Sequence, residues 1–319
     1  MFAVGLLVGA LMLVLAVRQV AWSSVATAVR GASPGWLAVA MLGYAATQAF
    51  IALRWRSLTG TRDRMSFGDA FDFLMVGAVA SLVLPPRLGD VVRAVAAGRY
   101  NDLSSSRMLG TIVIERLLDV VMLLGIGATL SVLMPISVAI RWALGTLLAV
   151  AMAASVVVWM GPSGPLGLLA KVVTRFRGTD SRLLQMVERF IDGISVVREP
   201  DRIPNSFGMG LLVWLSTAAA VSSTIIAFGI PAPWYAGAFV VLLINLGGLI
   251  PAPPAGIGVY HYFAMLAISP WAVDSGASFA FALVSHAISI TVVLILGTVS
   301  LARKGISLRG LRRIAEKIS

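Results

Sequence analysis

The sequence predicts an all-α integral membrane protein with about six full transmembrane helices and two re-entrant helical hairpins. Composition is the first observation: of the 319 residues, 59% are hydrophobic and 12% are charged, whereas soluble domains carry about 25% charged residues. The second is a series of apolar runs that reach the roughly 20 residues a helix needs to cross a bilayer. The third is that prolines, which lack the amide N–H that a continuous helix requires, interrupt two further apolar runs.

Six apolar runs are long enough to be full spans. The first resembles a secretory signal in length, but it lacks a basic start, and Arg18 follows its apolar core. We therefore interpret it as a retained span. The spans are predicted at 2–21, 35–53, 108–133, 140–160, 208–229 and 277–302.

Lysine and arginine set the predicted orientation, because basic loops stay on the cytoplasmic side of a membrane. They gather in the loop after the second span, in the long loop 162–207 and in the tail 303–319. We therefore expect a multi-pass protein of the cytoplasmic cell membrane with both termini in the cytoplasm. The basic residues assigned to the loop after the second span are Arg54, Arg56, Arg62 and Arg64.

The loop 162–207 contains a helical pattern of its own. Between Ser181 and Val197, apolar residues recur at helical spacing opposite a charged face, which is typical of an amphipathic helix. We expect this helix to lie on the cytoplasmic membrane surface as an orientation anchor. Its apolar residues are Leu184, Val187, Phe190, Ile191 and Ile194.

The two interrupted runs cover 67–102 and 234–269. If the first were a single crossing, the basic loop 162–207 would lie outside the cell, so we predict re-entrant hairpins that enter from opposite sides of the membrane. Broken segments of this kind mark the binding site of many transporters. The predicted break residues are Pro85, Pro86 and Gly89 in the first hairpin and Pro251 and Pro254 in the second.

This arrangement gives each half of the chain the order span, span, hairpin, span. It predicts one membrane domain built as an inverted repeat, with halves at 1–135 and 136–302. The alternative is that both interrupted runs are kinked helices that serve only in packing.

Charged residues occur where a membrane helix normally has none. Glu115, Arg116 and Asp119 fall inside the span 108–133 at spacings that place them on one helix face. Asp90 and Arg93 follow the first break at the same three-residue spacing. Intramembrane charges are costly unless they are paired or hydrated, so these residues are candidates for function.

Two interpretations of these charges are compatible. In one, they form salt bridges that hold the hairpin to the span, for instance Arg87 or Arg93 with Glu115 or Asp119. In the other, the arginines bind an anionic headgroup, because the guanidinium fork suits phosphate. The acidic residues could equally receive an amine or protons.

The second hairpin offers glycines and a histidine near its break. Gly256 and Gly258 allow a close approach of the backbone to a ligand. His261 could sense or relay protons. A hydrogen-bonded structural role is the alternative for this histidine.

Several classes of function are excluded or left without support. The chain has no cysteine, which excludes disulfides and thiolate sites, and its two histidines are too few for a histidine metal cluster. No GxSxG, P-loop or HExxH motif is present. The net charge of +11 comes from basic residues at the ends of apolar runs, so it indicates orientation rather than nucleic-acid binding. We expect no cofactor and no metal.

Four motifs occur in a fixed order along the chain: Arg54-Trp55, Pro85-x-Arg87-x-Gly89-Asp90-x-x-Arg93, Glu115-Arg116-x-x-Asp119 and Pro251-x-x-Pro254-x-Gly256-Ile257-Gly258. Together they resemble the transmembrane domain of the lysylphosphatidylglycerol synthases, also called multiple peptide resistance factors. The resemblance covers nearly the whole chain. It implies a lipid-translocating domain, and in a chain of 319 residues we expect a stand-alone member without the synthase domain.

Two positions depart from the family pattern. The family's Pro-Gly turn reads Pro254-Ala255 in this chain, and His261 stands where the family commonly has an acidic residue. If that acidic residue contacts a cationic headgroup, His261 indicates a different lipid.

The sequence therefore predicts a lipid flippase or transporter, and not an enzyme. It would move a phospholipid or an isoprenoid-phosphate-linked lipid between leaflets, with the anionic headgroup held between the two hairpins. The alternatives are a membrane transferase acting on a lipid-linked substrate and a non-catalytic partner of a separately encoded lipid-modifying enzyme; a homodimer also stays open. The candidate substrate contacts are Arg87, Asp90, Arg93, Glu115, Arg116, Asp119, Gly256, Gly258 and His261.

Overall fold

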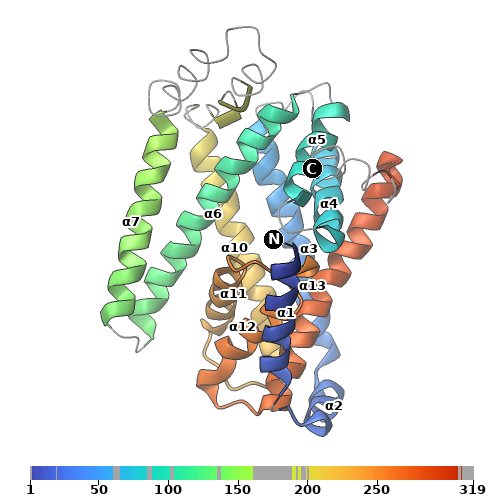
Figure 1. The fold of residues 1–319 in the computed structure, drawn as a ribbon, viewed down its shortest axis with the longest axis vertical. Helices are drawn as coiled ribbons and strands as arrows, with labels where there is room; N and C mark the ends of the chain where they lie inside the picture. Colours follow the sequence, from blue (N-terminus) through green and yellow to red (C-terminus); the bar gives the residue numbers. More distant parts are fainter. Residues whose placement is uncertain are drawn as a thin grey trace. The chain divides into compact units, whose positions relative to one another are not determined.

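Every regular element that the computed structural model describes is helical, as the sequence predicts (Figure 1). Three of the described helices are long and apolar enough to cross a membrane: α3 (Pro34–Thr59), α10 (Arg202–Ala227) and α13 (Ser275–Lys304). They coincide with three of the six predicted spans. The structure describes residues 2–18, 20–59, 65–84, 88–100, 104–134, 138–160, 189–191, 193, 194, 199, 201–307 and 310.

The predicted first span, 2–21, corresponds to α1 (Phe2–Val17). α2 (Trp22–Gly31) follows it at an angle of 85° and lies between the first two predicted spans. Counted as one span, this pair would be a fourth candidate. The total of six full spans and the direction of insertion stay predictions.

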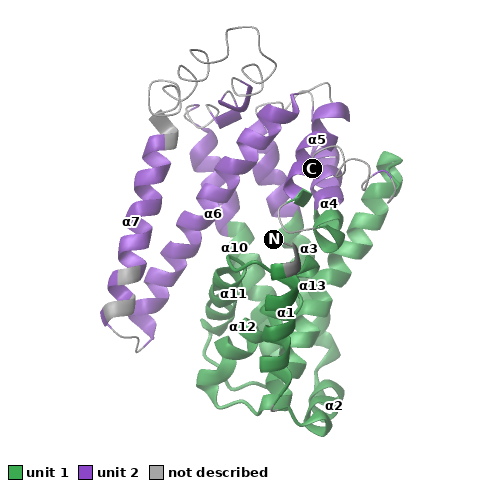
Figure 2. Cartoon of the chain, viewed as in Figure 1, with its two compact units in different colours: residues 1–48, 78–89, 212–307 green, residues 49–77, 90–211, 308–319 purple. Residues whose placement is uncertain are grey.

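The chain divides into two compact units that interleave along the sequence (Figure 2). Unit 1 contains residues 1–48, 78–89 and 212–307, and unit 2 contains residues 49–77, 90–211 and 308–319. Each unit therefore brings together segments that are far apart in the sequence. The predicted inverted repeat, with its halves at 1–135 and 136–302, stays a prediction.

The first interrupted run forms two helices, as expected. α4 (Phe67–Val83) and α5 (Leu88–Tyr100) are each shorter than the roughly 20 residues of a full span. The rings of Phe73 and Tyr100 lie 5.6 Å apart, so the start of α4 contacts the end of α5 as in a hairpin. Gly89, predicted as a break residue, is instead the second residue of α5. Pro85, Pro86 and Arg87 lie outside the described residues.

Reciprocal side-chain capping fixes the start of α4. The Ser66 hydroxyl accepts a hydrogen bond from the Asp69 amide at 3.0 Å, and the Asp69 carboxylate accepts one from the Ser66 amide at 3.1 Å. This capping box satisfies two amides that a helix start leaves free. A structural role therefore accounts for Asp69.

The second interrupted run also breaks where the prolines predict. α11 (Ala236–Gly247) and α12 (Val259–Ile268) pack against each other, and the turn between them contains the short 3-10 helix η3 (Pro254–Gly256). α1 packs on α12, and a Cβ added to Gly258 would collide with the carbonyl oxygen of Gly9. The helices are too short to cross a membrane separately, which agrees with a hairpin.

Ala255 adopts a left-handed backbone conformation, with φ 58° and ψ 3°. Because an L side chain in this region costs about 1 kcal/mol relative to glycine, the family's glycine at this position has a physical reason. We expect Ala255→Gly to raise the melting temperature by about 1–3 °C, since part of the gain is lost to the freer unfolded chain.

Ala252→Gly is the matched control, because Ala252 lies in the same turn and is not among the positive-φ residues. Its glycine variant should melt at or below the native temperature, measured by the same thermal unfolding in detergent. An Ala255→Gly variant that is destabilised as much as Ala252→Gly would contradict the assignment of strain to Ala255.

In unit 2, α6 (Ser105–Leu133) and α7 (Val138–Met160) pack along each other (Figure 1). The Ser104 side chain caps α6 by accepting a hydrogen bond from the amide of Arg107. α6 is the central element of the candidate site, because it carries three of the charged residues singled out by the sequence.

Two residues of the predicted amphipathic helix in the loop 162–207 are buried in protein. Ile191 and Ile194 are 7% and 2% exposed, and Ile194 packs with Leu58 and Ile114. The backbone passes close to α6 here, since a Cβ on Gly110 would collide with the carbonyl of Phe190. Leu184 and Val187 lie outside the described residues, so the helix on the membrane surface stays a prediction.

Candidate functional site

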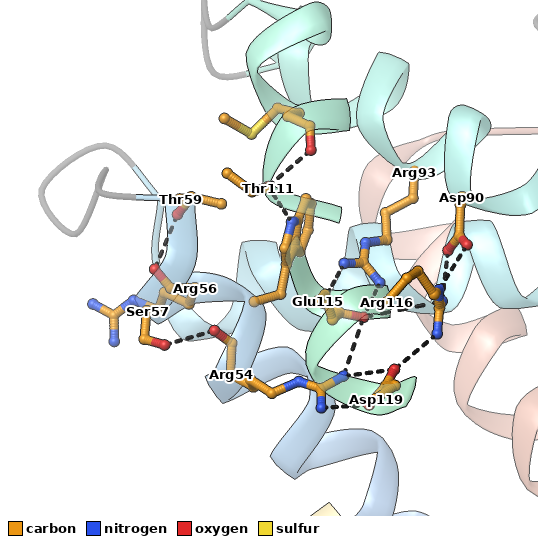
Figure 3. A network of polar contacts seen from close by, with 12 residues as sticks. Arg54, Arg56, Ser57, Thr59, Asp90, Arg93, Thr111, Glu115, Arg116 and Asp119 are labelled. Atoms are coloured by element: carbon orange, nitrogen blue, oxygen red, sulfur yellow. Dashed lines mark hydrogen bonds and ion pairs between the residues drawn. The ribbon is translucent and has the colours of Figure 1, made fainter. Parts of the chain in front are cut away.

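Six charged side chains from three helices meet in unit 2 (Figure 3). They are Arg54 at the end of α3, Asp90 and Arg93 on α5, and Glu115, Arg116 and Asp119 on α6. We call this set the charged cluster. Three guanidinium groups face three carboxylates, so the cluster is neutral overall.

The base of the charged cluster is buried. Arg93 and Glu115 are joined by an ion pair of 2.8 Å, and their side chains are 1% and 0% exposed. Arg54, also 1% exposed, binds both oxygens of Asp119 at 2.7 and 3.1 Å and lies 3.5 Å from Glu115. Buried ions of this kind are tolerated because each charge has an opposite charge in contact with it.

An aromatic ring supports the buried arginine. The guanidinium carbon of Arg93 lies 4.1 Å from the centre of the Trp55 ring, a favourable cation–π arrangement. The Trp55 indole N–H donates to the Thr111 hydroxyl at 3.1 Å, which in turn donates to the carbonyl of Met108. The ring is therefore fixed between α3 and α6, and it fixes Arg93.

The other end of the charged cluster is open. Arg116 is 54% exposed, and its guanidinium donates to both oxygens of Asp90 at 3.1 and 2.9 Å. It also donates to Asp119 at 3.2 Å. Asp90 and Asp119 are 25% and 18% exposed. Arg116 is therefore the most exposed member of the cluster.

The structure confirms the predicted salt-bridge network in part. Arg93 pairs with Glu115, and Arg116 pairs with its helix neighbour Asp119. Asp90 binds Arg116 on α6 rather than Arg93 on its own helix. Arg87 lies outside the described residues. Whether any of these residues contacts a substrate stays a prediction.

Arg54 is the residue that sequence reasoning placed wrongly. It was assigned to a cytoplasmic loop, but α3 continues to Thr59 and Arg54 is among the largest fully buried side chains. Its position next to Trp55 in the first family motif was the available signal. The buried position of Arg54 was hard to recognise, because arginines of cytoplasmic loops also occur at the ends of apolar runs.

The candidates of the second hairpin belong to unit 1. Gly256 and Gly258 both have positive φ, at 70° and 88°. Gly258 packs against the backbone of Gly9, so it serves a close contact between helices at this turn. His261 is 6% exposed, and its Nδ1 accepts a hydrogen bond from the Gly258 amide at 3.3 Å. Ligand contacts by these residues stay a prediction.

Each carboxylate of the charged cluster is occupied by a guanidinium group. In the part of the chain that the structure describes, no three histidine or acidic side chains are placed to hold a metal ion. What the cluster presents is thus a set of guanidinium–carboxylate ion pairs.

Residues 2–297 match the sequence model of the lysylphosphatidylglycerol synthase TM region. A UPF0104 membrane protein from Methanothermobacter thermautotrophicus is 26% identical over 278 residues, which cover 82% of this chain and 81% of that protein. Glycosyltransferase AglD from Haloferax volcanii is 23% identical over an alignment of 344 residues that covers 95% of this chain and 54% of AglD. This chain thus spans about half the length of AglD. No solved structure matches the chain.

The family match agrees with the helical fold, with the helices that can cross a membrane and with the four ordered motifs in the sequence. The chain belongs to the membrane-protein family defined by the transmembrane region of the lysylphosphatidylglycerol synthases.

Proposed function

We propose that this chain moves a lipid with an anionic headgroup between the leaflets of its membrane, and that Arg116 makes the first contact with the headgroup. The exposure of Arg116 carries this proposal, because the other cluster side chains are at most 25% exposed. A guanidinium binds phosphate in the same two-pronged way as it binds a carboxylate. A phospholipid or an isoprenoid-phosphate-linked lipid supplies such a phosphate.

Binding would proceed by exchange of partners. A phosphate that replaces Asp90 on Arg116 frees the first turn of α5, which two hydrogen bonds hold against α6. The buried pair Arg93–Glu115 keeps the rest of α5 attached to α6. Headgroup binding would thereby be linked to movement of the first hairpin. Passage of the headgroup between both hairpins stays a prediction, since residues 85–87 lie outside the described chain.

The second candidate is a membrane transferase that acts on a lipid-linked substrate. One relative is named a glycosyltransferase, which favours it, although this chain spans about half of that protein. The arginine partners of Asp90, Glu115 and Asp119 weigh against a divalent cation at these carboxylates. A role as partner of a separately encoded lipid-modifying enzyme stays a third expectation.

Lipid translocation in proteoliposomes tests the proposal. Native protein should accelerate the movement of fluorescent phosphatidylglycerol between leaflets, measured by the loss of fluorescence after a membrane-impermeant quencher is added outside. Arg116→Gln should lower the rate about 10-fold, because a hydrogen bond to a charged group contributes about 1.5–3 kcal/mol. Arg116→Lys should give an intermediate rate, since it keeps the charge without the planar fork.

Arg141→Gln is the matched control, because Arg141 is exposed near the start of α7 in the same unit. It should translocate lipid at the native rate. The double variant Asp90→Asn/Arg116→Gln also removes the charge of the aspartate that loses Arg116. It should still translocate lipid about as slowly as Arg116→Gln. Native rates in both Arg116 variants would remove the charged cluster from the mechanism. Product formation from a lipid-linked donor in detergent, without translocation, would favour the transferase.

A further inference from the structure

Both histidines of the chain lie together in unit 1, outside the charged cluster. His261 on α12 and His286 on α13 are each 6% exposed, and their ring centres are 5.1 Å apart. The chain contains no other histidine. Burying two titratable rings among apolar helices costs free energy of desolvation. Intramembrane histidines are therefore candidates for function, commonly in proton pathways.

The histidine pair holds the turn of the second hairpin at two points. The Nδ1 of His261 accepts a hydrogen bond from the Gly258 amide at 3.3 Å. His286 makes a backbone hydrogen bond with Ala255. Both partners have positive φ, at 58° for Ala255 and 88° for Gly258, so the histidines stabilise the strained part of the turn.

Protonation of His261 is incompatible with this arrangement. Its Nδ1 can accept from the Gly258 amide only while it carries a lone pair. A proton on Nδ1 turns it into a donor that faces another donor, so the hydrogen bond that caps the start of α12 is lost. Two charged rings at this separation would also repel each other, so the pair takes up one proton more readily than two.

A hydroxyl chain fixes the aromatic neighbour of the pair. The Tyr260 ring stacks on His286 with centres 4.2 Å apart, which leaves its π-face against the imidazole. The Ser285 hydroxyl lies 3.0 Å from the Tyr260 hydroxyl and 3.4 Å from that of Tyr44 on α3. Tyr260 therefore cannot turn away, and it offers a protonated His286 a cation–π partner.

Among the described residues, no carboxylate forms a hydrogen bond or an ion pair with either histidine. The titratable groups facing the pair are Tyr44 from α3 and Tyr260 from α12 itself. α1 and α11, which pack on α12, carry no titratable side chain. Asp274 caps the start of α13, about 18 Å along the helix from His286. The remaining charges on these helices are the exposed Arg30 of α2, Arg303 and Lys304 at the far end of α13, and Arg54 and Arg56 toward the end of α3.

We propose that His261 and His286 form a proton-binding site that controls the turn 251–258. Uptake of one proton from water by the Nδ1 of His261 forms an N–H bond and removes the acceptor of the Gly258 amide, which opens the cap at the start of α12 and frees the turn. Release of the proton restores the hydrogen bond. If the chain moves lipid as proposed above, this site gives that movement a dependence on protons; this part alone rests on the proposed function.

The absence of other histidines and of cysteine permits a direct test. In protein purified without a histidine tag, ¹³C-labelled histidine rings should give two signals. At least one should shift between about pH 4 and pH 8, which brackets the ordinary histidine pKa of about 6.5. A bimane fluorophore on Ile257→Cys, at a side chain that is 49% exposed in the turn, should report a step at the same pH.

Two conservative variants separate titration from structure. His261→Asn keeps an acceptor at the same number of bonds from the backbone but binds no proton, and it should abolish the bimane step while the protein stays folded. His286→Gln can still hydrogen-bond the Ala255 backbone and should move or remove the step. Ring signals that do not shift over the range, or a bimane step that persists in His261→Asn, would overturn the proposal.

These measurements are made in detergent and need no transport, so failed lipid translocation leaves their outcome unchanged. For the transport link, native protein should translocate lipid at rates that differ several-fold across the same pH range. His261→Asn should flatten this profile. A native profile retained by His261→Asn would overturn the link.

Discussion

Glu115→Gln is expected to lower the free energy of unfolding by about 3–5 kcal/mol, the usual cost of breaking a buried ion pair from one side. Glu115 is fully buried, and its carboxylate is the acidic partner of Arg93 at 2.8 Å. The neutral amide keeps an acceptor oxygen but no charge, so Arg93 would stay a buried cation over the Trp55 ring without the carboxylate that balances it. Because 1 kcal/mol shifts the melting temperature of a mid-sized protein by about 2–4 °C, we expect a fall of about 10 °C in detergent.

The matched control uses the same substitution at an exposed pair. Glu199 forms an ion pair of 2.7 Å with Arg202 and is 51% exposed, and exposed pairs contribute at most about 1 kcal/mol. Glu199→Gln should therefore change the melting temperature by no more than about 4 °C. The double variant Arg93→Gln/Glu115→Gln should recover part of the loss, since it leaves no unpaired charge. Equal melting temperatures for the two Glu→Gln variants would contradict the structural role of Glu115.

Gly258→Ala is expected to destabilise the second hairpin by more than about 3 kcal/mol, because backbone strain and overpacking act together. Gly258 has φ 88°, a conformation that L residues rarely adopt. The added methyl group would also collide with the carbonyl oxygen of Gly9 on α1, and backbone atoms at a helix contact cannot move as a flexible side chain can. The variant should melt about 6 °C or more below the native protein.

Gly256→Ala separates the two effects. Gly256 has φ 70° in the same turn, but a Cβ added to it would meet nothing within 4 Å. Its alanine variant therefore bears the backbone strain alone, about 1–2 kcal/mol. If Gly258→Ala melts at the same temperature as Gly256→Ala, then α1 does not pack on the turn as described.

The breaks in the helical runs were predictable because proline and glycine act locally. Pro251 and Pro254 lack an amide donor, and Gly258 permits a positive φ, whatever the surrounding tertiary structure. The interruption between α11 and α12 could therefore be predicted from the sequence. The exact edges could not, since Gly89 is compatible with both a break and a helix start, and it lies within α5.

The partners of the charges were predictable in part, and Arg93–Glu115 was one of the pairings between helices that the sequence offered. Arg116 and Asp119 are three residues apart on α6, so their ion pair follows from helix geometry. The pairs Arg54–Asp119 and Arg116–Asp90 join different helices and depend on packing that no single-sequence spacing records. For the same reason, the spacing of apolar residues between Ser181 and Val197 could not show that Ile194 packs in a protein core.

The charged cluster has a consequence for how the chain is made. Synthesis runs from the N-terminus, so Arg54 and Arg93 emerge before Glu115 and Asp119. Until α6 has been synthesised, both arginines lack the carboxylates that balance them and resist entry into lipid. We therefore expect Arg54 and Arg93 to leave the interface for their buried positions only after α6 has been synthesised, so a chain arrested before residue 115 should hold α5 less firmly than the complete chain.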